Sequence, residues 1–273
     1  MILKTLVENT SVSSEYKSKH GICFYIETKE HKILFDLGPN ELFLENAEKM
    51  GVAISEINTV VISHGHKDHG GALKLFLEHN QTAKVYIHED AFEEHYTKVL
   101  GFHINVGLDD SLKNHPQVVL TKNITAIEDH LLLFSDVTAK ELCSKSNHSL
   151  YAKRNGKIGL DDFSHEQNLI ITEGEKRILL AGCSHNGIVN IKSKAEGVVN
   201  HSITHVIGGF HLYNPVSRRK ESDTLVRSIS KRLKDDKTCY YTCHCTGKEA
   251  YAVLKGELLD NISYLSTGTV IEI

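Results

Sequence analysis

The sequence predicts an α/β protein, in which strands and helices alternate and polar turns connect them. Two observations favour this class. Short continuous apolar runs, such as "TVVIS" from Thr59, are typical of strands that are covered on both faces. Segments with helical spacing follow such runs, as in "GGALKLFLEHN", where Leu73, Phe76 and Leu77 recur on one face. Together with "KVYIH" from Lys84, these segments form one strand–helix–strand unit.

The same alternation continues on both sides of this unit. Strands are expected at "GICFYIET" and "KILFDLG" before it, and at "NLIITEG", "KRILLAG", "ITHVIGG" and "TCYYTC" after it. Helices are expected within residues 186–200, 222–236 and 247–258, and "ISYLSTGTVIEI" is expected to close the chain as a hairpin. The region 90–165 is the least regular. Its "EDAFEEHYTKVL" segment is interpreted as a helix, and the rest as insertion and lid material.

The composition is that of a globular protein. The chain has 273 residues, of which 40% are hydrophobic and 24% charged. Its net charge of −4 argues against nucleic acid or an anionic membrane as the main partner. No apolar run approaches the roughly 20 residues that cross a bilayer, and the first residues do not resemble a secretory signal. Six cysteines without a leader are expected to stay reduced, which favours the cytoplasm. The oligomeric state stays open.

Four side chains that can coordinate a metal lie within six positions of "SHGHKDHGG". His64 and His66 are two apart in extended chain, so both rings project to the same side, and Gly65 is expected to permit a sharp turn between them. Asp68 and His69 follow at the start of the next helix. Two ligands on one side and two displaced from them suit two cations better than one. Imidazole with carboxylate favours zinc, with iron or manganese as alternatives. A solvated turn that binds nothing is disfavoured, because histidines without partners beside a buried strand are costly.

Further histidines stand where other strands are expected to end. His185 follows "KRILLAGCS" and His244 follows "TCYYTC", and both are predicted metal ligands. His211, in "VIGGFHL", is predicted to reach the same cleft, either as a ligand or as a substrate contact. Because ligand sites in α/β proteins form where strands end and helices begin, these turns could all line one cleft.

Two other groups lie close to these histidines in the sequence. Lys248 in "TGKEA" and Arg218 in "SRRKES" could contact a phosphate or carboxylate of a substrate, although a solvated loop explains them equally well. Cys239, Cys243 and Cys245 have the same parity on an expected strand, opposite to that of His244. They are therefore predicted to pack as thiols on the face away from the ligand.

The ordered motifs "KILFDLG", "SHGHKDHGG", "LLAGCSH" and "CHCTG" resemble the metallo-β-lactamase superfamily of metal-dependent hydrolases, over nearly the whole chain. "GCSHNGIVNI", "GGFHL" and "HCTG" are similar to one branch of it. Members of this branch are described as metal-dependent hydrolases, and some as dihydropterin ribofuranosyl-aminobenzene phosphate synthases. The resemblance implies a four-layer αββα sandwich and a single domain over residues 1–273, with insertion or lid material around 90–165.

The resemblance also implies how the ligands divide. His64 and His66 would hold a first metal, and Asp68, His69 and His244 a second. Asp36, in "LFDLG", would support the histidine turn. Many members have a bridging aspartate where this chain has Cys183, which could be a thiolate ligand or a small buried residue, so the occupancy of the second metal is open. His185 is preferred over His165 as a further ligand, because it ends an apolar strand.

The predicted function is metal-dependent hydrolysis. A metal-activated hydroxide would attack an ester, lactone or phosphoester-type small molecule. Asp68 would orient the hydroxide as well as bind metal, and His211 or Lys248 would polarise the substrate. One alternative is a synthase-like transferase that uses the same metal site as a Lewis acid. A second is a non-catalytic metal-binding protein. A di-iron redox enzyme is disfavoured, because such relatives usually carry glutamate in place of His66.

Overall fold

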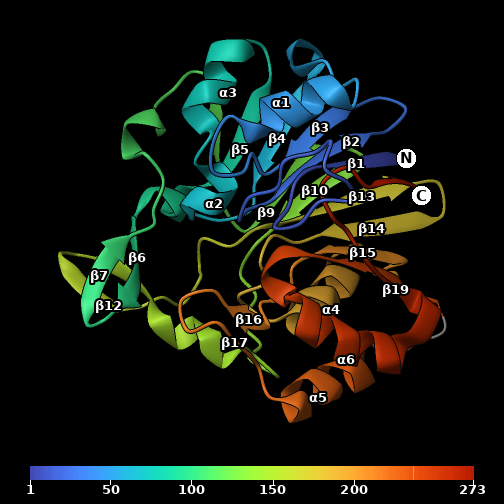
Figure 1. Ribbon diagram of the computed structural model, residues 1–273. Coiled ribbons are helices and arrows are strands. Elements are labelled where there is room, and N and C mark those ends of the chain that lie inside the picture. Colours follow the sequence, from blue (N-terminus) through green and yellow to red (C-terminus); the bar gives the residue numbers. More distant parts are fainter. Residues whose placement is uncertain (236) are drawn as a thin grey trace.

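The computed structural model describes residues 1–235 and 237–273. Two seven-stranded sheets pack face to face, and helices cover the outer face of each sheet, as Figure 1 shows. The predicted four-layer αββα sandwich is therefore confirmed. Three layers of buried apolar side chains hold it together: one between the sheets and one between each sheet and its helices. Strands such as "TVVI" are buried on both faces, which explains their continuous apolar runs.

The first sheet carries α1 (Leu42–Lys49) and α3 (Leu73–His79) on its outer face, and the short α2 (Lys67–Gly70) lies at its edge. Strands β3, β4, β5 and β8 run parallel, and the others pair antiparallel. In spatial order its strands are β20 (Val270–Glu272), β1 (Ile2–Val7), β2 (Cys23–Glu27), β3 (Lys32–Phe35), β4 (Thr59–Ile62), β5 (Lys84–His88) and β8 (Val118–Thr121).

The second sheet is covered by α4 (Ile188–Val199), α5 (Asp223–Leu233) and α6 (Lys248–Leu258). The three helices expected in this half are confirmed, and Ser222 caps α5 by accepting a hydrogen bond from the Leu225 N–H. Strands β14, β15, β18 and β19 run parallel. The spatial order is β19 (Ile262–Tyr264), β18 (Cys239–Thr242), β15 (His205–Gly208), β14 (Lys176–Leu180), β13 (Asn168–Glu173), β10 (Leu131–Phe134) and β9 (Ile124–Glu128).

The region 90–165 builds a small sheet that stands apart from the sandwich, at the left of Figure 1. Its strands are β12 (Lys157–Leu160), β11 (Leu150–Arg154), β6 (Glu94–Val99) and β7 (Phe102–Asn105). The same region also supplies β8, β9 and β10 to the two large sheets, so only part of it is peripheral. The helix expected over 89–100 is wrong. A 3-10 turn over Glu89–Phe92 leads into β6, where β-branched residues and pairing with β7 and β11 favour a strand.

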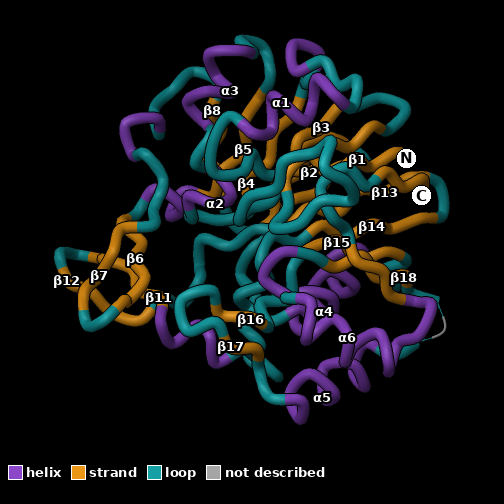
Figure 2. The backbone as a smooth tube through the Cα atoms, viewed as in Figure 1, coloured by secondary structure: helices purple, strands orange, loops and turns teal. Residues whose placement is uncertain are grey.

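The end of the chain also differs from expectation. The predicted closing hairpin does not form, because β19 pairs with β18 in the second sheet whereas β20 pairs with β1 in the first. The two termini consequently lie side by side, as the tube in Figure 2 shows, and the Met1 amino group donates a hydrogen bond of 3.0 Å to the Ile273 carbonyl. A two-stranded ribbon, β16 (Tyr213–Asn214) with β17 (Arg219–Lys220), connects β15 to α5 and lies to the left of α4 in Figure 2. Across residues 1–235 and 237–273, no helix combines the length and apolarity that a membrane crossing requires.

Candidate metal centre

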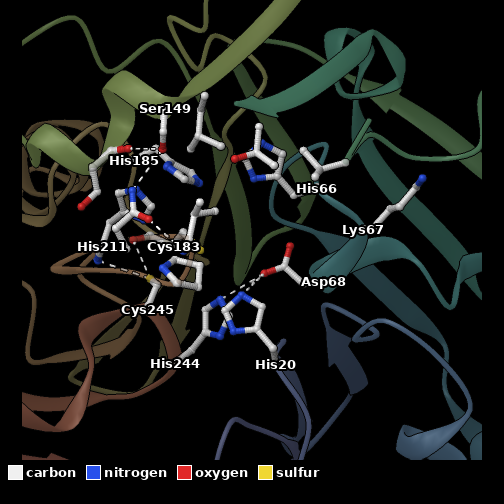
Figure 3. Close-up of a pocket in the computed structure, with 17 residues that line it drawn as sticks. His20, His66, Lys67, Asp68, Ser149, Cys183, His185, His211, His244 and Cys245 are labelled. Atoms are coloured by element: carbon white, nitrogen blue, oxygen red, sulfur yellow. Dashed lines mark hydrogen bonds and ion pairs between the residues drawn. The ribbon is translucent and has the colours of Figure 1, made fainter. Parts of the chain in front are cut away.

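Four strand ends meet at one edge of the sandwich. His64 and His66 follow β4, Cys183 and His185 follow β14, His211 follows β15 and His244 follows β18. Each of these strands is parallel to its neighbour, so their carboxyl ends lie at a common edge. The structure thus brings the predicted turns together around a cavity of about 280 Å³, whose lining includes five of these six side chains. Figure 3 shows His66 and Asp68 facing Cys183, His185 and His211 across it.

A first cluster consists of His64, His66 and His185, all of which are buried. His64 Nε2 lies 3.0 Å from His66 Nδ1. The centre of the His185 ring lies 4.9 Å from that of His64 and 5.1 Å from that of His66. Three imidazoles at these separations can direct one nitrogen each towards a single ion.

A second cluster gathers around Asp68. Asp68 Oδ2 lies 3.6 Å from His69 Nε2 and 3.3 Å from His244 Nε2. His20 Nε2 lies 3.3 Å from the same oxygen, and its ring packs against that of His244. His244 Nε2 nevertheless makes no hydrogen bond. Nitrogen and oxygen atoms at these separations can act as neighbouring ligands of one ion.

Cys183 lies between the two clusters. Its Sγ is 3.2 Å from His69 Nε2. It groups with His64 and His185 on one side, and with His69 and His244 on the other; in each group, the potential ligand atoms lie within 4.8 Å of one another. Without metal, burial and then the neighbouring Cys245 raise the pKa of the Cys183 thiol. A thiol in this position can become a shared thiolate ligand only by losing its proton to metal binding.

The outer nitrogens of the candidate ligand histidines have hydrogen-bond partners that hold the rings. His69 Nδ1–H donates to Asp36 Oδ2 at 2.6 Å. His64 Nδ1–H donates to Ser63 Oγ at 2.9 Å, and the Ser63 hydroxyl donates in turn to the same Asp36 oxygen at 2.8 Å. Asp36 therefore lies against the histidine turn and orients two rings at once. In the neutral form of both rings the proton is on Nδ1, and Nε2 carries the lone pair.

The two histidines that follow strands of the second sheet, His185 and His244, are also held through their Nδ1 atoms. His185 Nδ1–H donates to Asn147 Oδ1 at 3.0 Å, and His244 Nδ1–H donates to Asn9 Oδ1 at 2.8 Å. The Nε2 atoms of both rings are buried and have no hydrogen-bond partner. Buried polar atoms without partners are rare in native proteins. Lone pairs that converge in this way are the donor set that a divalent transition metal requires, so the residues present suit such ions.

The electrostatics of the metal-free site agree with this assignment. Burial, followed by neighbouring histidines, lowers the pKa of His64 and of His185 well below the ordinary value, so both rings are neutral near pH 7. His69 differs: burial opposes its charge, but Asp36 and Asp68 outweigh burial and raise its pKa to about 9. A metal ion at His69 must therefore displace a proton.

Three other predicted residues, His211, Lys248 and Arg218, differ in how close they lie to the cavity. His211 is buried, lines the cavity and has no hydrogen-bond partner on either ring nitrogen. Lys248 lies beside this cavity, in a neighbouring one of about 250 Å³ that shares His244 with it, and its Nζ lies 3.4 Å from the centre of the Tyr264 ring. Arg218 is exposed at the tip of the β16–β17 ribbon, and the structure does not bring it into the lining of either cavity.

The prediction for Cys245 is wrong. Strand β18 ends at Thr242, and the chain turns into a 3-10 turn over His244–Thr246, with His244 at φ 51°. The strand parity therefore stops before Cys245, which lines the cavity and accepts a hydrogen bond from the His211 N–H at 3.3 Å. Cys243 does pack between the sheets, as expected.

The role of Gly65 also differs from expectation. A Cβ atom at this position would meet the Ala91 backbone carbonyl oxygen and lie 2.6 Å from His95 Nε2, so glycine is required because both approach the backbone closely. His95, His20 and Asp161 lie near the site, although the sequence did not predict them. They lie in loops or strands without a local metal-binding pattern, and His165, the less favoured candidate, lies beside His66 rather than in either cluster.

The fold and site together define a class: an αββα sandwich that gathers histidines, a carboxylate and a thiol at the edge shared by its two sheets. Residues 20–155, about half of the chain, match the model of the metallo-beta-lactamase superfamily. The chain belongs to this superfamily, as its motifs predicted.

Two curated relatives come from Methanocaldococcus jannaschii. One, the uncharacterized protein MJ0448, is 28% identical over all of both chains. The other is 27% identical over 98% of this chain and 95% of its own, and is named 7,8-dihydropterin-6-methyl-4-(beta-D-ribofuranosyl)-aminobenzene-5'-phosphate synthase. Among solved structures, Tm1679, described as a metal-dependent hydrolase of the beta-lactamase superfamily, is 29% identical. Its TM-score is 0.83, with 100% of this chain and 99% of that chain covered.

Proposed function

We propose that this protein is a metal-dependent hydrolase with a dinuclear site, for which zinc is the favoured ion. The observation that carries the proposal is the convergence of buried imidazole Nε2 atoms, each with its Nδ1 hydrogen bonded to an outer partner, on both sides of Cys183. The 29% identity to a metal-dependent hydrolase over the whole chain supports it. Iron and manganese remain the alternative ions.

The geometry supports one division of the ligands. His64 Nε2, His66 Nδ1 and His185 Nε2 would hold the first ion. The second would be held by Asp68 Oδ2, His69 Nε2 and His244 Nε2, with Cys183 Sγ shared between the two ions. When bound, such a metal pair supplies Lewis acidity, which acidifies water and polarises an ester, lactone or phosphoester group.

The side chains around the ions position the substrate. Asp68 is the one carboxylate among the residues that line the cavity, and as an acceptor it can orient an attacking water as well as bind metal. His211, with both ring nitrogens unpartnered, can donate a hydrogen bond to the substrate oxygen that gains negative charge. Val106, Leu150 and Val216 form apolar parts of the same wall. The cavity therefore suits a small molecule with a reactive carbonyl or phosphoryl group and an apolar body.

A synthase reaction is the second candidate, because the relative that is named as a synthase aligns along nearly the whole chain. Beside His244, the cavity of about 250 Å³ is lined by Lys220, Lys248 and Gly247. Two lysines at this place would suit a phosphate group of a pterin or riboside substrate. The same metal site would then act as a Lewis acid for carbon–nitrogen bond formation.

One experiment separates these functions. Zinc-loaded protein is incubated with a panel of esters, lactones and phosphodiesters, and separately with a pterin diphosphate and a phosphorylated aminobenzene riboside. Hydrolysis of a panel member that His185→Ala abolishes supports the hydrolase, whereas a condensation product supports the synthase. Metal binding without turnover in either assay would contradict both and favour a non-catalytic metal-binding protein.

We also propose a small-molecule substrate and a cytoplasmic location. The described cysteines are all free thiols, which supports a reducing compartment. The net charge of −4 supports neither nucleic acid nor an anionic membrane as a partner.

A further inference from the structure

A buried group of three side chains lies next to His66, with potential ligand atoms within 4.8 Å of one another and of one on His66. His95 comes from β6, whereas Asp161 and His165 come from the segment between β12 and β13. His95 Nδ1 lies 3.0 Å and His165 Nε2 lies 3.1 Å from the same oxygen, Asp161 Oδ2. The other oxygen, Oδ1, accepts a hydrogen bond from the Phe163 N–H at 2.8 Å. All three side chains are at least nine-tenths buried, and neither of the proposed metal clusters uses them.

The hydrogen bonds of His165 decide whether this group is a third metal site. The Gly65 N–H donates to His165 Nδ1 at 3.0 Å, so Nδ1 carries the lone pair of this ring. The proton of a neutral imidazole is then on Nε2, which donates it to Asp161. A metal ion at Nε2 would force the proton onto Nδ1, where it would face the Gly65 N–H. The donors therefore favour a hydrogen-bonded network over a metal site.

The same reasoning fixes the proton of His95. Its Nδ1–H donates to Asp161 Oδ2, so its Nε2 carries a lone pair, and this Nε2 is buried without a partner. His66 Nδ1 lies 3.0 Å from His64 Nε2, and when both nitrogens hold the first proposed ion, the proton of the His66 ring is on Nε2. This Nε2 is also buried without a partner. A donor and an acceptor that both lack partners thus belong to rings that meet edge to face, with centres 5.8 Å apart.

We propose that His95, held by Asp161 and His165, is a positioning residue that accepts the His66 Nε2–H, directly or through one water molecule. This inference rests on the proposed function, because it assigns His66 Nδ1 to a metal. The chain His66–His95–Asp161 sets the tautomer and orientation of His66, as Asp36, Asn147 and Asn9 do for the other ligand histidines. The edge of the His95 ring, together with the Ala91 carbonyl oxygen, also occupies the space that a Cβ at residue 65 would take.

The test uses two variants and one matched control. His95→Phe keeps a ring but removes the acceptor, and Asp161→Asn keeps the shape but removes the carboxylate that orients His95. Asp162→Asn alters the exposed neighbouring carboxylate, which pairs with Arg154, and serves as the control. Zinc affinity is measured by chelator competition at fixed pH, and the imidazole N–H exchange of His66 is measured by NMR in zinc-loaded, ¹⁵N-histidine-labelled protein.

We expect wild type to bind two zinc ions. In His95→Phe and in Asp161→Asn, one of the two binding steps should weaken by about 10- to 100-fold, while the other stays unchanged and Asp162→Asn behaves as wild type. In zinc-loaded wild type, the His66 Nε2–H should exchange slowly, and in His95→Phe it should exchange fast. The exchange measurement on wild type keeps the test valid even if a variant folds poorly.

Four results would overturn the inference. One is that both zinc ions bind to the two variants as tightly as to wild type. Another is that the His66 Nε2–H exchanges fast in wild type. In either case only this inference fails and the dinuclear site stands. A third zinc equivalent that disappears in Asp161→Asn would identify the group as a metal site instead. Wild type that binds no zinc would refute the proposed function together with the inference.

Discussion

Cys183 is the residue that most distinguishes this site from the pattern with a bridging carboxylate. Its sulfur lies where one ligand can reach both clusters. Thiolate is a softer ligand than carboxylate and favours zinc among the common divalent ions. The occupancy of the second metal, which the sequence left open, therefore depends on whether this thiol ionises.

We predict that Cys183→Ala binds the second metal at least about tenfold more weakly, because one shared ligand is lost. Cys183→Asp should keep both ions, since a carboxylate can bridge them. Metal content by mass spectrometry and the absorption of cobalt-loaded protein, in which a thiolate ligand gives a charge-transfer band, check both expectations. Cys239→Ala, on the half-buried strand β18, is the control. Full occupancy in Cys183→Ala would show that the thiol is only a packing residue.

A second prediction concerns His69 and pH. In the metal-free chain, Asp36 and Asp68 outweigh burial and raise the His69 pKa from the ordinary 6.5 to about 9. A proton therefore competes with the metal for Nε2 at every pH below about 9, and this competition weakens as pH rises. Zinc affinity should increase at least about tenfold per pH unit from neutral pH up to about 9. Calorimetric titration at several pH values measures this, and an affinity independent of pH would contradict the assignment of His69.

Residues of the site could be predicted from the sequence only where their local spacing indicated a metal-binding turn or the end of a strand. The His64–His69 turn could be recognised in the sequence because its four potential ligands lie within six positions, between an expected strand and an expected helix. His185 and His244 could be predicted as candidate ligands because each follows an apolar run that was expected to form a strand. Cys245 was misjudged because parity stops where the strand ends. His20 and His95 lie near the site through tertiary contacts alone, and no local pattern indicates them.

At the scale of elements, the small sheet forms part of the cavity wall. Thr97 of β6 and Leu150 of β11 line the cavity, while Leu100 at the tip of the β6–β7 hairpin is 94% exposed. The prediction of a helix was wrong here because "EDAFEEHYTKVL" contains helix-forming residues. Pairing with two neighbouring strands overrode that local preference. Such pairing depends on residues about 50 positions away, which a local pattern does not contain.

Leu150→Ala should raise KM for a hydrolysed substrate by about fivefold, corresponding to about 1 kcal/mol of lost apolar contact, and leave the metal content unchanged. Leu100→Ala removes the same atoms at the exposed tip and should leave KM as in wild type. Steady-state kinetics with metal analysis measures both. An unchanged KM in Leu150→Ala would show that this wall does not touch the substrate.

At the scale of the whole molecule, the site joins the two halves of the sandwich. His64, His66 and His69 follow the first sheet, whereas His185 and His244 follow strands of the second. The alternating strands and helices predicted an α/β protein, and the resemblance of the motifs to the superfamily implied the αββα architecture. The pairing of β20 with β1 was not, because it brings residues 2–4 and 270–272 together across the whole chain.

Because the proposed ligands come from both halves, metal binding should stabilise the native state against unfolding. Ions present at about 1,000 times their Kd contribute about 4 kcal/mol. Their removal by a chelator should then lower the melting temperature by roughly 10 °C for a chain of this size. Differential scanning calorimetry checks this, with recovery on added zinc as the control. An unchanged melting temperature after verified metal removal would argue against ligands shared by the two sheets.

The most direct test of the central claim is a count of metal ions in protein purified without chelators. Elemental analysis by mass spectrometry should find two equivalents of divalent transition metal per chain, mainly zinc, and His185→Ala should retain fewer. Less than one equivalent in the wild-type protein would contradict the dinuclear site.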